Sequence, residues 1–146
     1  MKFDKRPIVY ITKKIEFSSA HRLLNEDLSV EENQYLYGKC YNPNGHGHNY
    51  ILEVTLRGPI SERTGMIINL TELKKIVNKH VVELLDHKHL NKDVEHFKKL
   101  NPTAENIIVV IWKILEKEFE SGLLYKLLMR ETGSNSVEYY GEELED

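Results

Sequence analysis

The chain has 146 residues, of which 40% are hydrophobic and 29% are charged, a balance that is ordinary for a globular protein with one core. Its net charge of -3 gives no indication of a nucleic-acid or anionic-membrane partner, and a single cysteine excludes an intrachain disulfide. No apolar run has the length of a signal peptide or a membrane span, so we expect residues 1–146 to form one cytoplasmic domain.

The first predicted element is a strand over residues 8–18, because apolar side chains recur there at alternate positions. Its inward face is expected to consist of Val9, Ile11, Ile15 and Phe17. The same alternation continues through Ser19 to His21. His21 is therefore expected to face the core at the end of this strand.

A long connection follows, and it is expected to contain a short helix. Ser29 and Glu32 have the spacing of a capping box, and Gly38 is expected to end the helix. The connection then brings Cys40 to the end of the sheet that holds His21. A solvated cover loop is the alternative, although long loops in compact domains are often functional.

Turn residues and two histidines mark the start of the next strand. The run Asn42–Gly45 (NPNG) predicts a tight turn, and the alternation after it predicts a strand over residues 49–57. Counted back at period two, His46 and His48 share the apolar, inward face. If the two strands pair antiparallel, both histidines lie near the end of the sheet that carries His21.

These three imidazoles are candidate metal ligands. Three neutral histidines with an open fourth position are typical of a catalytic zinc site, because structural zinc usually has four protein ligands that are mostly thiolates. The spacing of the histidines is not diagnostic by itself. Hydrogen-bonded core or surface histidines are the alternative, and the common strand face of all three favours the metal site.

The middle of the chain predicts a short strand and a helix. Residues 66–68 are expected to form the strand, and Asn69 and Glu72 have the positions of an N-cap and its partner in a capping box. The apolar stripe of this helix has helical spacing and belongs to the core. It consists of Leu70, Leu73, Ile76, Val77, Val81, Leu84 and Leu85. Asp86 and His87 follow directly, and on residue type alone they indicate a polar turn.

The last third predicts a second helix and two strands. Thr103 is expected to cap the helix, with Glu105 in its first turn. A strand over residues 123–131 would place Glu131 on its apolar side, where a carboxylate needs a partner. That apolar side is expected to consist of Leu123, Tyr125, Leu127 and Met129. A short strand over residues 137–140 ends the pattern.

This order of elements predicts an α+β fold with an antiparallel sheet. Two helices cover one face of such a sheet, so the other face and both edges would be exposed in a monomer. Edges of this kind are rarely left free, and closure of several subunits into a barrel removes them. We therefore expect an oligomer.

Several segments of the chain resemble the 6-pyruvoyltetrahydropterin synthase family. They are Phe17–Leu23 (FSSAHRL), Gly38–Tyr50 (GKCYNPNGHGHNY), Leu85–Asn91 (LDHKHLN), Thr64–Met66, Pro102–Asn106, Tyr125-Lys126 and Glu131-Thr132. The resemblance covers nearly the whole chain in order, and its most specific part is the histidine-glycine-histidine block with the upstream cysteine. It is closer to the animal-type enzymes than to the bacterial queuosine-pathway relatives.

The resemblance implies a fold, an assembly and a reaction. The fold is the tunnelling fold, in which trimers form a barrel and two trimers make a hexamer. The reaction converts 7,8-dihydroneopterin triphosphate to 6-pyruvoyl-tetrahydropterin by triphosphate elimination and internal redox rearrangement. One zinc ion per subunit is implied on His21, His46 and His48. Mg²⁺ is a further candidate cofactor, which would bind together with the triphosphate of the substrate.

The resemblance also assigns roles in proton transfer. Cys40, Asp86 and His87 correspond to a proton-relay triad, with Cys40 as the base because the pKa of a thiol falls near a cation. A buried structural thiol is the alternative for Cys40, and a polar turn is the alternative for Asp86 and His87.

Three further residues correspond to the substrate pocket. Glu131 resembles the pterin anchor, since a carboxylate can accept two parallel hydrogen bonds from the edge of a pterin ring. Thr103 and Glu105 lie in a segment that contributes to the pocket in relatives, and helix capping is their alternative role.

Two other functions remain open from the sequence. The first is another enzyme on the same site, either a 6-carboxytetrahydropterin synthase or a pterin side-chain-cleaving enzyme, and the presence of Cys40 argues against the variants that carry glutamate there. The second is a non-catalytic, zinc-stabilised oligomer that binds a pterin. A three-histidine site with an open position and a nearby thiol argues against this binding role.

Overall fold

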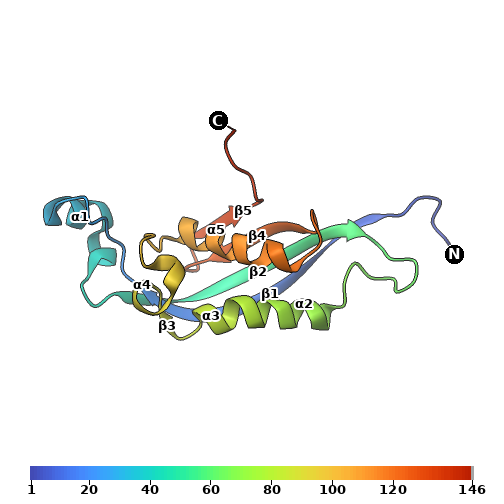
Figure 1. Ribbon diagram of the computed structural model, residues 1–146, viewed down its shortest axis with the longest axis horizontal. Coiled ribbons are helices and arrows are strands. Elements are labelled where there is room, and N and C mark those ends of the chain that lie inside the picture. Colours follow the sequence, from blue (N-terminus) through green and yellow to red (C-terminus); the bar gives the residue numbers. More distant parts are fainter. Residues whose placement is uncertain (146) are drawn as a thin grey trace.

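The computed structural model of the protein describes residues 1–145, and its centre is a five-stranded sheet in the order β3-β1-β2-β4-β5 (Figure 1). The strands are β1 (Ile8–His21), β2 (His46–Pro59), β3 (Lys88–His89), β4 (Leu124–Arg130) and β5 (Ser136–Tyr139). The helices are α1 (Val30–Tyr37), α2 (Leu70–Val77), α3 (Glu83–Leu85), α4 (Leu90–Asp93) and α5 (Ala104–Leu115). All strand pairs are antiparallel except β3, which runs parallel to β1. The α+β fold predicted from the sequence is confirmed.

The long ribbon of β1 and β2 sets the position of every other element. The two strands pair without interruption from Ile8 opposite Pro59 to His21 opposite His46. Burial alternates along β1 as predicted, and the inward side ends in three buried residues, Phe17, Ser19 and His21. β2 begins at His46, three residues before the predicted start, because the backbone of the histidine block already pairs with β1.

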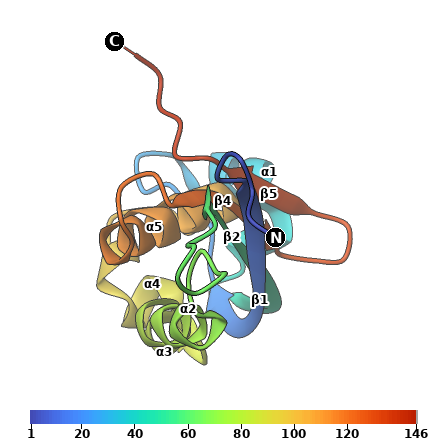
Figure 2. The ribbon, with the colours of Figure 1, turned by 90° about the vertical axis from the view of Figure 1, so that its right-hand side faces the viewer.

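The helices cover one face of this sheet. Figure 2 shows α2, α3 and α5 on the same side of the strands. Asn69 caps α2 by accepting a hydrogen bond from the Thr71 backbone, and a π-helical turn, Asn78–Val82, joins α2 to α3. The core between helices and sheet contains Leu52, Val54, Leu56, Leu73, Val77, Val81, Leu85, Ile107, Ile111, Leu115, Leu127 and Met129, all at most 1% exposed. Of the predicted α2 stripe, Leu70 is 55% exposed and does not belong to the core, because it lies in the first turn of the helix.

The capping box predicted for the long connection is present. The Ser29 side chain accepts a hydrogen bond from the Glu32 backbone, the Glu32 carboxylate accepts one from the Ser29 backbone, and Gly38 ends α1 with a φ of 51°. A 3-10 turn, Gly38–Tyr41, then leads the chain back to the start of β2. Figure 1 shows α1 at the end of the molecule where β1 finishes and β2 begins.

Two predictions about strands are wrong. Residues 66–68 form bends rather than a strand, because the Met66 carbonyl accepts a hydrogen bond from the Ser61 backbone inside its own loop. β4 contains a bulge opposite Thr55 and Leu56, so that Leu124 is buried and Tyr125 is 38% exposed. The alternation predicted for β4 therefore holds for Leu127 and Met129 and fails before them.

The edges of the sheet are open for most of their length. β3 pairs only with Ser19 and Ala20 of β1, so within residues 1–145 the longer part of β1 has a strand neighbour on one side only. In the same part of the chain, no helix combines the length and the apolar composition that crossing a membrane requires.

Candidate metal centre and active site

The three histidines predicted as metal ligands lie together where β1 ends and β2 begins. His21 is directly opposite His46 in the ladder, and Ser19 is opposite His48. One nitrogen of each imidazole lies within 4.8 Å of the others. The alternation along both strands therefore brings the side chains to one point, as the sequence predicts.

A hydrogen bond determines which nitrogen of His21 is free. His21 Nδ1 lies 2.7 Å from the carbonyl oxygen of Pro102, and because a carbonyl only accepts, Nδ1 carries the proton. The Nε2 lone pair then points toward His46 Nε2, 3.1 Å away. Burial lowers the pKa of His21 to about 4 against the opposing effect of the Pro102 bond. The ring is therefore neutral at physiological pH, as a metal ligand must be.

The other two imidazoles carry buried nitrogens without partners. Burial, and then the proximity of His48, lower the pKa of His46. Within the described residues, His46 Nδ1 and His48 Nε2 are buried and have no hydrogen-bond partner. An unpaired buried nitrogen is unfavourable, and a metal ion bound with the Nε2 atoms of His21 and His46 would satisfy the lone pair of His48 Nε2. The histidines present therefore fit a metal ion.

Glu131 reaches this cluster from the end of β4. One of its carboxylate oxygens lies 3.8 Å from His48 Nε2, and its side chain is 22% exposed. The residue follows the last position of β4 and donates its backbone N–H to Asn135. Sequence reasoning placed this carboxylate on the buried side, and the structure places it half-buried beside a histidine.

Tyr50 belongs to the same group, and sequence reasoning assigned it no role in the site. It is fully buried, and its hydroxyl lies 3.5 Å from His21 Nδ1. Its ring stacks on Phe17 with centroids 5.0 Å apart. Tyr50 lies two residues after His48 on the same strand face, and this spacing could have predicted that its side chain lies near the histidines.

Cys40 is half-buried in the 3-10 turn beside the cluster. Burial, and then the Glu131 carboxylate, raise the pKa of its thiol. Cys40 and Glu131 in turn contribute to raising the pKa of Tyr50, after burial as the main cause. The lowering of the Cys40 pKa that a nearby cation would cause is not found in the described part of the chain, because the charge that acts on the thiol is the negative Glu131 carboxylate.

Asp86 and His87 lie on the outer edge of β1. The Ser18 backbone donates to Asp86 Oδ1 at 2.8 Å and accepts from the His87 backbone at 2.6 Å. Asp86 Oδ2 and His87 Nδ1 are 2.8 Å apart, and the His87 side chain is 84% exposed on a left-handed backbone with φ of 59°. In the described part of the chain, neither residue has a hydrogen bond or an ion pair with Cys40.

Thr103 and Glu105 have the positions of helix-capping residues. The Thr103 hydroxyl accepts a hydrogen bond from the Asn106 backbone at 3.2 Å, and Glu105 is exposed in the first turn of α5. The segment before α5 contacts the three-histidine cluster through Pro102, whose carbonyl oxygen orients the His21 ring. Sequence reasoning missed Pro102, because no side chain marks a backbone acceptor.

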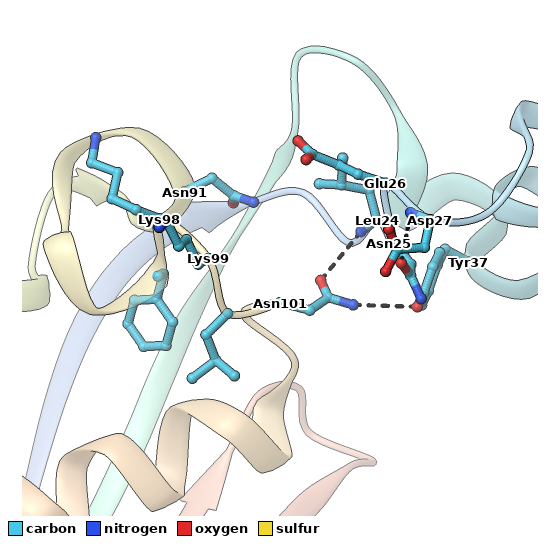
Figure 3. A pocket seen from close by; sticks show the side chains of 11 residues that line it. Leu24, Asn25, Glu26, Asp27, Tyr37, Asn91, Lys98, Lys99 and Asn101 are labelled. Carbon is cyan, nitrogen blue, oxygen red and sulfur yellow. Dashed lines mark hydrogen bonds between the residues drawn. The ribbon is translucent and has the colours of Figure 1, made fainter.

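A hollow of about 520 Å³ lies next to this region, between residues 24–27 and residues 98–101 (Figure 3). Its lining contains none of the predicted site residues. The Asn101 side chain crosses it, accepting from the Leu24 backbone at 3.2 Å and donating to the Tyr37 hydroxyl at 3.3 Å. These two hydrogen bonds of the Asn101 side chain hold the loop that follows β1 against the loop that precedes α5.

The sheet, its helices on one face and the three-histidine cluster define a protein of the tunnelling-fold class with a candidate metal site. The chain belongs to the 6-pyruvoyl tetrahydropterin synthase family, whose sequence profile matches residues 10–142. Human 6-pyruvoyl tetrahydrobiopterin synthase is 48% identical over 132 residues, which cover 90% of this chain and 91% of the human protein. The solved Caenorhabditis elegans 6-pyruvoyl tetrahydropterin synthase superposes with a TM-score of 0.90 at 40% identity, covering 96% of this chain and all of that one.

A bacterial relative is more distant. The 6-carboxy-5,6,7,8-tetrahydropterin synthase of Rickettsia bellii is 29% identical over 130 residues, covering 78% of this chain and 86% of the bacterial protein. The membership expected from the sequence motifs is confirmed, and the similarity is greater to the animal enzymes.

Proposed function

We propose that the protein is a zinc-dependent 6-pyruvoyltetrahydropterin synthase that converts 7,8-dihydroneopterin triphosphate to 6-pyruvoyl-tetrahydropterin and triphosphate. The observation that carries the proposal is the three-histidine cluster beside a thiol and a carboxylate, in a chain 48% identical to the human enzyme of that name. The proposal includes a cytoplasmic location and a hexameric assembly.

Zinc is the metal that the ligand set favours. His21, His46 and His48 are three neutral nitrogen ligands, and catalytic zinc sites combine three protein ligands with an open position. Two nitrogens each about 2.0–2.1 Å from a tetrahedral zinc are about 3.3 Å apart, and the Nε2 atoms of His21 and His46 are 3.1 Å apart. When bound, zinc would supply Lewis acidity toward the side-chain hydroxyls of the pterin.

Glu131 is proposed to orient the pterin ring. Its carboxylate lies at the rim of the cluster and is half-buried, so that a ring bound there would exclude much of its remaining water. Two parallel N–H···O bonds to the ring would fix the side chain of the substrate over the three histidines. Thr103 and Glu105 are proposed to line the entrance, and Mg²⁺ is proposed to accompany the triphosphate.

The reaction needs proton transfers and no external oxidant. Loss of triphosphate from the terminal carbon turns the adjacent alcohol into a ketone after tautomerisation. The remaining side-chain alcohol is then oxidised as the dihydropterin ring is reduced to the tetrahydro level, so that electrons balance within the substrate. Cys40 is proposed as the base that takes protons from the side-chain carbons.

Asp86 and His87 are proposed to relay those protons across a subunit contact. Among the described residues of a single chain they have no hydrogen bond or ion pair with Cys40, and the exposed His87 side chain has its Nδ1 held by Asp86. A strained backbone at an exposed, oriented imidazole is a common feature of functional positions. In the proposed oligomer the His87 of one chain would reach the Cys40 of another, along the open edge of β1.

Product identification tests the proposal. Zinc-loaded protein is incubated with 7,8-dihydroneopterin triphosphate without reductant, and the pterin released is identified by mass spectrometry. We expect 6-pyruvoyl-tetrahydropterin and free triphosphate. Release of 6-carboxytetrahydropterin or of a pterin without its side chain would assign one of the related activities, and binding without turnover would indicate a pterin-binding oligomer.

A further inference from the structure

Arg22, the residue after the metal-ligand candidate His21, holds the turn that carries Cys40. Its Nε–H donates to the carbonyl oxygen of Tyr41 at 2.9 Å. Its guanidinium carbon lies 4.3 Å from the centroid of the Tyr41 ring. The side chain therefore makes a charge-assisted hydrogen bond and a cation–π contact with one residue.

The next residue along the chain adds a second attachment to the same turn. The Leu23 backbone N–H donates to the carbonyl oxygen of Cys40 at 2.8 Å. Two consecutive residues after His21 thus bind two consecutive residues of the turn. The position of the thiol relative to the histidines depends on these contacts, because they attach the 3-10 turn directly to the two residues that follow His21.

The backbone of Arg22 is itself fixed by Asn91. The Asn91 side-chain amide accepts from the Arg22 N–H and donates to the Arg22 carbonyl, both at 2.8 Å. This pair of bonds resembles strand pairing, two residues beyond the last pair that β3 makes with β1. Arg22 therefore has a defined backbone direction and a defined side-chain direction.

We infer that Arg22 is a positioning residue that fixes Cys40 beside the metal centre through Tyr41. The inference rests on the proposed role of Cys40, and it assigns to Arg22 no contact with substrate. Lysine cannot replace it, because an ammonium group has neither the directed Nε–H nor the flat face that stacks on tyrosine. Contact between the Arg22 guanidinium and the substrate triphosphate is the alternative that the test must separate.

The test compares Arg22→Lys with a matched control. Arg57 makes the same kind of contact elsewhere in the β1–β2 ribbon, with its Nε 3.0 Å from the Tyr10 hydroxyl and its guanidinium over the Tyr10 ring. Arg57→Lys therefore removes another arginine–tyrosine contact, at the opposite end of the β1–β2 ribbon from the histidine block. Both variants retain the net charge of the chain.

Three quantities are measured on each zinc-loaded protein: hydrogen exchange of the Leu23 amide, kcat and KM with dihydroneopterin triphosphate, and the affinity for dihydroneopterin, which has no triphosphate. For Arg22→Lys we expect Leu23 protection and kcat each to fall about tenfold, the size of a lost charged hydrogen bond. KM, pterin affinity and zinc content stay at their wild-type values. Arg57→Lys leaves all of these quantities unchanged.

Two results would overturn the inference. One is unchanged Leu23 exchange and kcat in Arg22→Lys. The other is a rise in KM for the triphosphate substrate with unchanged Leu23 exchange, which would assign Arg22 to the triphosphate. If Arg22→Lys does not fold, Tyr41→Leu removes the stacking face alone, and smaller losses of the same two quantities are expected, with no loss contradicting the inference.

The outcome separates this inference from the proposed function. A wild-type protein without turnover would contradict the proposed function, and the exchange of the Leu23 amide would still decide whether Arg22 holds the turn.

Discussion

His21 combines three properties that a metal ligand needs, and each has a separate cause in the structure. Its position at the end of β1 follows from strand alternation, its tautomer follows from the Pro102 carbonyl, and its neutral state follows from burial. The sequence predicts the first of these from the parity of the strand. It does not predict the second, because Pro102 is 81 residues away along the chain.

The low pKa of His21 predicts a pH dependence of stability for the metal-free protein. Because the pKa of His21 is about 4 in the folded state and about 6.5 for an unperturbed histidine, the unfolded state binds more protons between these values, and the free energy of unfolding falls as pH falls through this window. A shift of this size corresponds to roughly 3 to 4 kcal/mol at most. Well above pH 6.5 neither state is protonated at His21, and the effect is absent.

Urea unfolding of metal-free wild type and His21→Asn at several pH values between 4 and 7.5 measures this effect. Asparagine can still donate to the Pro102 carbonyl but does not titrate. We expect the pH slope to decrease in the variant without vanishing, because burial also lowers the pKa values of His46 and His89. An identical slope in both proteins would contradict the assignment.

Glu131→Gln tests the proposed pterin anchor. The substitution removes the charge and replaces one acceptor oxygen with a donor, and a charged hydrogen bond contributes roughly 1.5–3 kcal/mol. Pterin affinity should therefore fall by about one to two powers of ten, with zinc content unchanged. Calorimetry at equal zinc loading measures it, and an unchanged affinity would exclude Glu131 as the anchor and favour Glu105.

At the scale of the elements, the regular alternation of buried and exposed residues along the strands could be predicted from the sequence. The places where this alternation is interrupted could not. The inward faces of β1 and β2 follow directly from period two in the sequence. The bulge in β4 has no marker in its own sequence, because it arises where two pairing registers meet at Thr55 and Leu56. The two-residue strand β3 directly follows Asp86 and His87, which residue type alone identified as a polar turn.

The turn before β2 is an element whose geometry depends on one glycine. Gly45 has a φ of 75°, and a Cβ placed on it would lie 2.9 Å from both the His21 carbonyl oxygen and His89 Nε2. The turn can therefore bring His46 opposite His21 only if residue 45 has no side chain. His89 occupies the space beside Gly45, although both its ring nitrogens lack partners among the described residues.

Gly45→Ala is expected to weaken metal binding. Gly65 is a matched control, because it has a φ of 74° and no atom within 4 Å of the position of a Cβ. Both substitutions carry the backbone cost of about 1–2 kcal/mol for a left-handed alanine, and only Gly45→Ala adds a clash with backbone. We expect zinc affinity, measured by chelator competition, to fall at least tenfold in Gly45→Ala and to stay at the wild-type value in Gly65→Ala. Equal affinities would show that the turn tolerates the side chain.

At the scale of the whole molecule, the residues proposed for catalysis do not all meet in one chain. The three histidines, Cys40 and Glu131 gather at one end of the sheet, and the pair Asp86 and His87 lies on its outer edge. The sequence cannot distinguish a site within one chain from a site shared between chains, because order along the chain contains no information about which copy supplies a residue. The open edge of β1 favours sharing.

Mixing two inactive variants tests whether the site is shared. Cys40→Ala and His87→Ala should each retain zinc and fold and lose about 10² to 10⁴ in rate, the usual effect of removing a proton-transfer group. If Cys40 and His87 of different chains act together, refolding the variants as a mixture restores some sites with both residues intact, about a quarter for random 1:1 assembly of a symmetric oligomer. A mixture as inactive as its components would place the relay within one chain or remove His87 from it.

The most direct test of the central claim is anomalous scattering at the zinc edge from crystals of the metal-loaded protein. The account predicts one zinc ion per chain, about 2.0–2.1 Å from one nitrogen each of His21, His46 and His48, with water or substrate as the fourth ligand. A zinc ion with Cys40 as its fourth ligand, or the absence of zinc from the three histidines, would contradict it.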